Sequence, residues 1–323
     1  MEEEQHEVVI VGAGIAGLAT AVALKIVGLQ TLVLERSPEL RATGAAIGLS
    51  SNAWRALDVL GVAHKLLPSC PTVPKAVVTD LPTGSIQAVP FTRSQRGDTA
   101  TRIVHRKDLL ETLAEELKPG TIRFSSKITS IDQDASSSVT AVHLDDGSVV
   151  KAKVLIGCDG VHSVVARWLG LSEPVHSGRS AVRGLAVFPE GHGLKNGVVQ
   201  YGRIHKGCVT VAGDAMHPMT PDLAQGGCTA LEDAIVLARN LAGARSRGQL
   251  AAGLESYVRE RRWRAAWLIA ASYFSGWVQQ GGNAGVWRSS VEWFRRNIYY
   301  KFLHSRIFDA IHQYDCGDLL PAE

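Results

Sequence analysis

Residues 7–35 read EVVIVGAGIAGLATAVALKIVGLQTLVLE, and this stretch decides the fold. The run VVIV at residues 8–11 is continuously apolar and mostly β-branched, which is typical of a strand buried on both faces of a parallel sheet. A glycine-rich turn follows, then an Ala- and Leu-rich segment, Leu18 to Val27, which predicts a helix that ends at Gly28. Thr31 to Leu34 is the second predicted strand. This order predicts a Rossmann-type α/β unit.

The turn, Gly12-Ala13-Gly14-Ile15-Ala16-Gly17, has the pattern G-x-G-x-x-G. Alone this pattern is a weak signal, but here it follows a strand and opens a helix, which makes it specific. Gly12 allows the tight turn, Gly14 lets a pyrophosphate approach the backbone, and Gly17 lets the helix and the strand pack closely. The N–H groups and the dipole of the helix N-terminus would face the phosphates.

An acidic residue, Glu35, ends the second strand, 18 residues after Gly17. A carboxylate at this place can hold the ribose hydroxyls of an adenosine, and it would repel a ribose phosphate. The permanent ligand is therefore not expected to be NADP. A tight turn without a ligand is the alternative, and the strand–turn–helix–strand context argues against it.

Two later segments distinguish FAD from NAD as the ligand. Val154 to Gly160 reads VLIGCDG, and Val209 to Pro218 reads VTVAGDAMHP, so each is an apolar strand that ends in a Gly- and Asp-containing turn. Ligands of open α/β sheets bind at the C-terminal ends of the strands, where Asp159 and Asp214 are predicted to lie. Such carboxylates can accept hydrogen bonds from a polyol such as the ribityl chain of FAD.

Together these motifs resemble the aromatic-hydroxylase class of FAD monooxygenases, named for p-hydroxybenzoate hydroxylase, and in particular the plant monooxygenases similar to zeaxanthin epoxidase. The motifs follow the order of that family and cover nearly the whole chain. They are Gly12 to Gly17 with Glu35-Arg36, Arg41 to Gly48, Arg106 to Leu110, Cys158 to Ser163, Gly213 to Pro218, Gln225 to Cys228 and Glu232 to Ala234.

The resemblance implies a cofactor site; the catalytic residues stay unassigned, and no metal is expected. Asp159-Gly160 would serve both FAD and a transient NAD(P)H, Asp214 the ribityl chain, and Pro218 the surroundings of the flavin ring. A helix cap remains the alternative for Asp214, a surface salt bridge is an equal alternative for Arg106, and His217 is not assigned as a base. The cofactor-binding set is Gly12, Gly14, Ile15, Ala16, Gly17, Glu35, Arg36, Arg41, Arg106, Asp159, Gly160, Asp214, Pro218, Gly226 and Gly227.

The same resemblance implies the reaction and the domain order. NAD(P)H would reduce the flavin, and the reduced flavin with dioxygen would oxygenate a small apolar or aromatic compound. The expected fold is α/β: a Rossmann-type FAD-binding domain, an interleaved and truncated β-sheet substrate domain, and a helical C-terminus. The FAD-binding parts are residues 1–72, 101–177 and 206–250, the substrate-domain parts are 73–100 and 178–205, and the C-terminal helices are 251–323.

Two departures from the family pattern stand out. Ala224 precedes Gln225-Gly226 where the family usually has glycine, and its methyl group would restrict the loop near the flavin if that site needs positive φ. Only 54 residues separate Asp159 from Asp214, although the family spends a much longer segment there on its substrate-domain sheet. Gly197 to Gly202 begins a strand of that sheet, and Arg203 to Gly207 then leads directly to the Gly-Asp strand. We interpret this junction as an internal deletion.

The composition excludes several other classes of protein. The chain has 323 residues, 46% of them hydrophobic, and a net charge of +3, which does not predict nucleic-acid binding. Five scattered cysteines suggest neither a disulfide framework nor a zinc site, so a reducing, cytoplasmic location is expected. The weakly polar run Ala265 to Val278 is too short to span a membrane. We do not predict a membrane contact, although Trp263, Trp267 and Trp277 flank this run with several arginines.

Three functions remain open at this stage. The first is an FAD-dependent monooxygenase. The second is a flavin-binding protein that lacks coupled oxygenase activity because part of the substrate domain is missing. The third, a plain NAD dehydrogenase, is disfavoured by Gly213-Asp214 and by the lack of a recognisable proton-transfer pair.

Overall fold

A computed structural model gives the arrangement of most of the chain. The residues it describes are 4–41, 46–72, 75–79, 86–90, 101–133, 139–171, 205–206, 209–244, 246–279 and 288–319. Apart from His205, the substrate-domain part expected at 178–205, with the strand that begins at Gly197 to Gly202, lies outside these residues.

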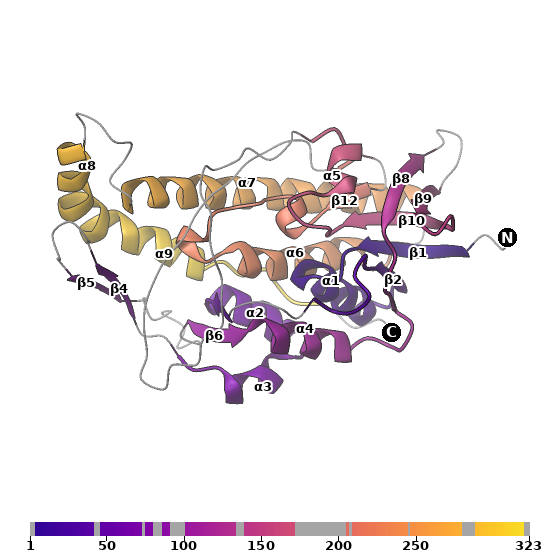
Figure 1. The fold of residues 1–323 in the computed structure, drawn as a ribbon, viewed down its shortest axis with the longest axis horizontal. Coiled ribbons are helices and arrows are strands. Elements are labelled where there is room, and N and C mark those ends of the chain that lie inside the picture. The colour runs from indigo at the N-terminus through magenta and orange to yellow at the C-terminus, as the bar shows by residue number, and fades with distance from the viewer. Residues whose placement is uncertain are drawn as a thin grey trace.

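The largest sheet has eight strands, and its centre is parallel (Figure 1). Along one path its order is β11-β12-β10-β1-β2-β7, and β1 pairs in parallel with both β10 and β2. The side chains of Val8, Val9 and Ile10 are completely buried, as expected for a central strand. The bounds are β1 Glu4–Val11, β2 Thr31–Leu34, β7 Ile122–Arg123, β10 Val149–Gly157, β11 His205–Lys206 and β12 Val209–Val211.

Antiparallel strands extend or accompany this sheet. The strands β8 (Ile128–Gln133) and β9 (Thr140–Leu144) pair with each other, and β9 also pairs with β10. The turn from β9 to β10 contains Gly147 at φ +81°, as the Asp-Asp-Gly sequence predicts. Two small sheets are separate: β3 (Ala46–Leu49) with β6 (Arg102–His105), and β4 (Lys75–Thr79) with β5 (Ile86–Pro90).

Helices cover the large sheet and extend away from it. The helix α1 packs against α6, and α6 packs in turn against α2 and α7. In Figure 1, α6 and α7 run side by side along the longest axis of the molecule, with the sheet toward one end and α8 at the other. The bounds are α1 Ile15–Ile26, α2 Ser51–Val59, α3 Ala63–Leu66, α4 Arg106–Glu115, α5 Val164–Trp168, α6 Gly226–Leu241, α7 Arg247–Gln279, α8 Arg288–Phe294 and α9 His304–His312. Short 3-10 turns lie at η1 Leu67–Ser69, η2 Gly213–Ala215 and η3 Pro221–Leu223.

The fold class predicted from the sequence is confirmed, and the C-terminal region needs one correction. The strand from Val209 joins the same parallel sheet as β1 and β10, pairing Leu155 with Val209. The helices expected over 251–323 include one stretch of another kind: after α8 the chain forms a π-helix, η4, over Arg295–Leu303, and then α9. Apolar periodicity alone does not distinguish a π-helix from an α-helix over so short a segment.

The backbone at Ala224 has a positive φ, the conformation in which the methyl group was expected to be restrictive. Its φ is +53°, in the left-handed region, between η3 and the start of α6. A β-carbon there is strained against the neighbouring carbonyl oxygen, which glycine avoids. The side chain of Ala224 is exposed, so no packing depends on it.

We therefore expect Ala224→Gly to stabilise the fold. Relief of the strain should exceed the added entropy of the unfolded glycine, for a net gain of about 0.5 kcal/mol in the free energy of unfolding. Ala270→Gly, at an exposed position inside α7, is the control and should cost about 1 kcal/mol. Urea denaturation measures both, and a loss of stability in Ala224→Gly would contradict the interpretation of this turn as strained.

Candidate functional site

The glycine-rich turn between β1 and α1 is packed too tightly for side chains at two of its positions. Gly12 has φ +99°, and a β-carbon on it would lie 2.5 Å from the carbonyl oxygen of Cys158. A β-carbon on Gly17 would lie 1.9 Å from the carbonyl oxygen of Gly12. Real contacts are never this short, so both glycines are required to bring α1 against the ends of β1 and β10.

Gly14 differs from these two glycines because it borders open space. Its φ is −81°, which any residue adopts, and a β-carbon on it would meet nothing within 4 Å. It is the N-cap residue of α1 and lines a cavity. The position therefore tolerates a side chain as far as the fold is concerned, and the space beside it is left for a ligand at the positive end of the helix.

The cavity has a volume of about 330 Å3 and lies where the parallel strands end. Every predicted cofactor-binding residue lines it except Gly17, which is buried in the turn, and Pro218. The residues that line it are Val11, Gly12, Gly14, Ile15, Ala16, Leu34, Glu35, Arg36, Arg41, Arg106, Ser126, Lys127, Ile128, Cys158, Asp159, Gly160, His162, Val164, Asp214, Gly226, Gly227 and Ala230.

Glu35 has a structural function that the sequence did not reveal. Its Oε2 accepts a hydrogen bond from the backbone N–H of Ala13 at 2.8 Å, and its Oε1 accepts one from Ser37 at 2.9 Å. The carboxylate thus ties the glycine-rich turn to the end of β2. Each oxygen keeps a further lone pair, so these bonds leave acceptor capacity for a ribose hydroxyl.

Asp159 is directed toward α5 within the same site. Its carboxylate accepts hydrogen bonds from the Ser163 hydroxyl at 2.5 Å and the Val164 N–H at 2.6 Å. Burial raises the pKa of this carboxyl group above its ordinary value, and these hydrogen bonds offset part of the rise. Asp159 therefore fixes the turn after β10 and the start of α5, while the same residue borders the cavity.

Asp214 and the start of α6 meet on another side of the cavity. Asp214 belongs to η2 and its side chain is exposed. A β-carbon on Gly226 would lie 3.8 Å from Asp214 Oδ1, and one on Gly227 would lie 3.3 Å from Ile47 Cδ1. The two glycines thus keep the first turn of α6 open beside an acidic side chain.

Cationic side chains balance the acidic ones around the cavity. Arg36, Arg41, Arg106 and Lys127 all line it, and the Arg106 guanidinium donates a hydrogen bond to the Arg41 carbonyl at 2.6 Å. This mixture of cations, carboxylates and helix N-terminal N–H groups matches an elongated ligand. Such a ligand would join an anionic pyrophosphate to hydroxyl-rich ribose and ribityl groups.

Sequence reasoning missed the contribution of residues 126–128 and of His162. Ser126, Lys127 and Ile128 precede or begin β8, a strand that carries no family motif. A lysine beside a strand has no signal of its own in one sequence. His162 lies within a quoted motif but was not assigned to the site.

The comparison with protein families places the chain. A model described as "FAD binding domain" matches residues 5–199 and 193–272. The two matches overlap at residues 193–199, just before the junction at 203–207 that we interpret as an internal deletion. The chain belongs to this family of FAD-binding monooxygenases.

Two plant monooxygenases of similar sequence support this family membership. Monooxygenase 2 of Arabidopsis thaliana is 35% identical over 417 aligned positions, covering 99% of this chain and 100% of that protein. Monooxygenase 1 of the same plant is 35% identical, covering 84% and 90%. Since this chain has only 323 residues, at least 94 of the 417 positions (417 less 323) have no counterpart in it.

The likeness to solved structures concerns the fold. The chain resembles Klebsiella pneumoniae HpxO complexed with FAD and uric acid, with a TM-score of 0.73, 21% identity, and coverage of 95% of this chain and 96% of that one. Among the described helices, we find none long and apolar enough to cross a membrane. In the same part of the chain, no group of three or more His, Cys, Asp or Glu residues is arranged to hold a metal ion.

The geometry of Gly14 gives a first prediction for this site. In Gly14→Val the new side chain should fill the space beside the helix N-terminus and abolish flavin retention, while thermal stability of the flavin-free protein stays unchanged. The purified protein's visible absorbance and its melting temperature measure these two effects.

Gly17→Ala is the matched control for that variant. Its β-carbon would collide with the Gly12 carbonyl, so it should lose stability as well as flavin. If Gly14→Val purified with wild-type flavin absorbance, the assignment of this turn to the cofactor would be wrong.

Asp214 gives a second prediction. If its carboxylate accepts hydrogen bonds from the ribityl chain, Asp214→Ala should weaken FAD binding about tenfold, which corresponds to the loss of one charge-assisted bond. The fold should persist because the side chain is exposed. Asp145→Ala, an exposed carboxylate outside the residues that line the cavity, removes the same charge and should leave the affinity unchanged. Equal FAD affinity of Asp214→Ala and wild type in fluorescence titration would exclude this role.

Proposed function

We propose that this chain binds FAD in the cavity described above and uses NAD(P)H and dioxygen to oxygenate a small apolar or aromatic compound. The observation that carries the proposal is convergence. Gly14, Asp159 and Asp214 come from distant parts of the sequence, follow three adjacent parallel strands, and line one cavity. Family membership and the FAD in related structures support the same cofactor.

The residues of the chain divide the work of binding. The N–H groups at the start of α1 would hold the pyrophosphate, and Glu35 the adenosine ribose. Asp214 would accept hydrogen bonds from the ribityl chain, and Gly226 and Gly227 would leave room for the ring. The cations Arg36, Arg41, Arg106 and Lys127 would offset the phosphate charge.

The bound flavin would supply the redox chemistry, taking two electrons from NAD(P)H and passing them to dioxygen. The protein would contribute position and exclusion of water, because the reaction needs neither a nucleophile nor a metal from the chain. Exclusion of water also decides the product: in a wet site the electrons end on hydrogen peroxide instead of supporting oxygenation of the substrate.

The length of the chain favours a second candidate function, NAD(P)H oxidation that yields hydrogen peroxide. The short stretch between Asp159 and Asp214 and the 94 unmatched positions both indicate that a segment of the family pattern is absent. In the family this segment supplies much of the substrate-domain sheet, so its loss would remove a wall of the substrate pocket. The motifs for the cofactor are present, with Ala224 as their one departure from the family pattern.

The two candidates differ in coupling, which one experiment measures. FAD-loaded protein is given NAD(P)H and a panel of small aromatic and terpenoid compounds, and NAD(P)H consumed, peroxide formed and oxygenated product are all quantified. Because loss of the segment would remove a wall of the substrate pocket, we expect most of the reducing equivalents to appear as peroxide. The flavin-free Gly14→Val protein serves as the blank.

Each result of that experiment decides something. Product formed in nearly equal amount to NAD(P)H consumed would establish the monooxygenase and exclude the uncoupled candidate. If the flavin-loaded protein oxidised neither NADH nor NADPH, both candidates would be excluded.

A further inference from the structure

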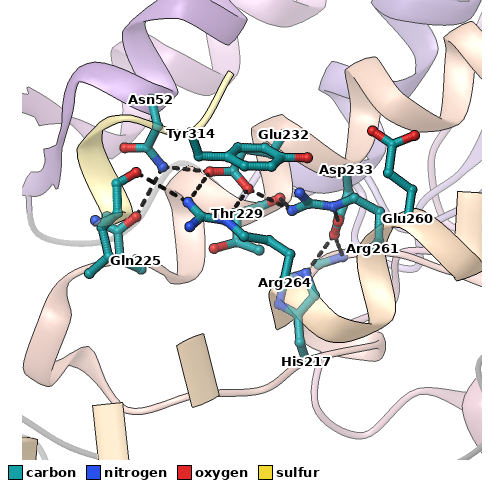
Figure 2. A network of polar contacts seen from close by, with 12 residues as sticks. Asn52, His217, Gln225, Thr229, Glu232, Asp233, Glu260, Arg261, Arg264 and Tyr314 are labelled. Carbon is teal, nitrogen blue, oxygen red and sulfur yellow. Dashed lines mark hydrogen bonds and ion pairs between the residues drawn. The ribbon is translucent and has the colours of Figure 1, made fainter. Parts of the chain in front are cut away.

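A buried network of charged side chains links the Gly213–Asp214 turn to α6 and α7 (Figure 2). Asp233 of α6 stands at its centre. Its Oδ2 accepts a hydrogen bond from the backbone N–H of Gly213 at 2.9 Å and lies 2.5 Å from His217 Nε2. Its Oδ1 accepts a hydrogen bond from Arg261 Nε at 2.8 Å. The side chains of Asp233, His217 and Arg261 are completely buried.

The network continues from Arg261 to Glu232. Arg261 Nη2 donates to Glu232 Oε2 at 2.7 Å, and Arg264 Nη2 donates to Glu232 Oε1 at 2.8 Å. Asn52 of α2 donates to the same Oε1 at 2.7 Å. Two carboxylates thus face two guanidinium groups, and Figure 2 shows His217 at the Asp233 end.

Burial disfavours the charged forms of Asp233 and His217, and the oppositely charged neighbours of each residue shift its pKa in the other direction. Burial alone would raise the pKa of Asp233, but His217 and Arg261 hold it below its ordinary value. Burial alone would lower the pKa of His217, and Asp233 raises it overall. Asp233 is therefore an anion at neutral pH, and an anionic carboxylate is a stronger acceptor for a backbone N–H than a neutral group.

The backbone that Asp233 holds directly adjoins the cavity. Gly213 has φ +62°, and a β-carbon on it would lie 2.7 Å from the β-carbon of Ala16 in α1. The turn is thus pressed against the first turn of α1, and Gly213 has no side chain that could hold it there. The next residue, Asp214, lines the cavity, so the Gly213 N–H bond to Asp233 fixes the backbone directly before that carboxylate.

We propose that Asp233, held between Arg261 and His217, is a positioning residue for the flavin half of the cofactor: it fixes the Gly213–Asp214 turn against α1 so that the Asp214 carboxylate faces the ribityl chain. This inference rests on the proposed binding of FAD. Through it, the long helix α7 contributes to a cofactor site that none of its described side chains lines.

The proposal predicts an effect on one half of the ligand and not on the other. The ADP half is assigned to Gly12–Gly17, α1 and Glu35, which lie outside the network. Asparagine has a single acceptor oxygen, so Asp233→Asn cannot serve both Arg261 and the Gly213 N–H. We expect this variant to bind FAD about tenfold more weakly, the effect of one charge-assisted bond, and ADP within about twofold of wild type.

The measurement uses the flavin-free full chain, titrated with FAD by flavin fluorescence and with ADP by calorimetry. Arg264→Gln is the matched control, because it removes a similarly buried ion pair with Glu232 that makes no contact with Gly213. It should lower the melting temperature and leave the ratio of FAD to ADP affinity unchanged. His217→Gln keeps a donor near Asp233 without the charge, and should shift the ratio in the same direction as Asp233→Asn by a smaller factor.

The outcomes separate this inference from the proposed function. If wild type bound ADP and not FAD, the proposed function would fail and this inference with it. If wild type bound FAD, and Asp233→Asn and His217→Gln weakened FAD and ADP equally or changed neither, the network would be structural only. A selective loss of FAD affinity in either variant, absent from Arg264→Gln, establishes positioning even if the other variant does not fold.

Discussion

The rest of the structure depends on the contact between the glycine-rich turn and the end of β10. Gly12 and Gly17 have no room for a β-carbon, because the carbonyl oxygens of Cys158 and Gly12 occupy the space that each would need. This contact places the N-terminus of α1 at the C-terminal ends of β1 and β10. Once it is formed, the turn after β10 and the turn after β12 have to border the same cavity, because all three strands are parallel neighbours.

Electrostatics then gives the cavity its character. Carboxylates at Glu35, Asp159 and Asp214 line the cavity together with guanidinium and ammonium groups. Two of these carboxylates also hold the backbone that forms the site: Glu35 binds the glycine-rich turn, and Asp159 binds the start of α5. Asp233 holds backbone in the same way, because its carboxylate accepts a hydrogen bond from the N–H of Gly213 in the turn after β12. Each of the three turns that border the cavity is thus secured by a carboxylate accepting backbone N–H groups.

Much of this arrangement was predictable from the sequence, because it follows from local patterns. The first strand, the glycine-rich turn, the helix and Glu35 lie within one continuous stretch, and the two later Gly- and Asp-containing turns follow apolar runs that had to be buried strands. Ala224 was noted as a departure that would restrict the backbone if positive φ were needed there, and its φ is +53°. Binding roles for the individual residues remain predictions.

What the sequence did not reveal depends on contacts between distant residues. Lys127 reaches the cavity from a strand that carries no motif. The pairing of Asp233 with Arg261 requires the register between α6 and α7, and no periodicity in either helix specifies which buried arginine meets which carboxylate. His217 invites interpretation as a base, yet it is fully buried and its Nε2 lies 2.5 Å from Asp233 Oδ2, so that carboxylate already occupies its ring nitrogen.

The central claim is that this cavity is built for FAD, and the ligand released from the purified protein tests it most directly. The protein is expressed at full length, its visible absorption spectrum is recorded, and the ligand freed by heat is identified by chromatography and mass spectrometry. The account predicts a flavin spectrum and FAD in stoichiometric amount. A colourless protein that does not take up added FAD, or one that releases NAD instead, would contradict it.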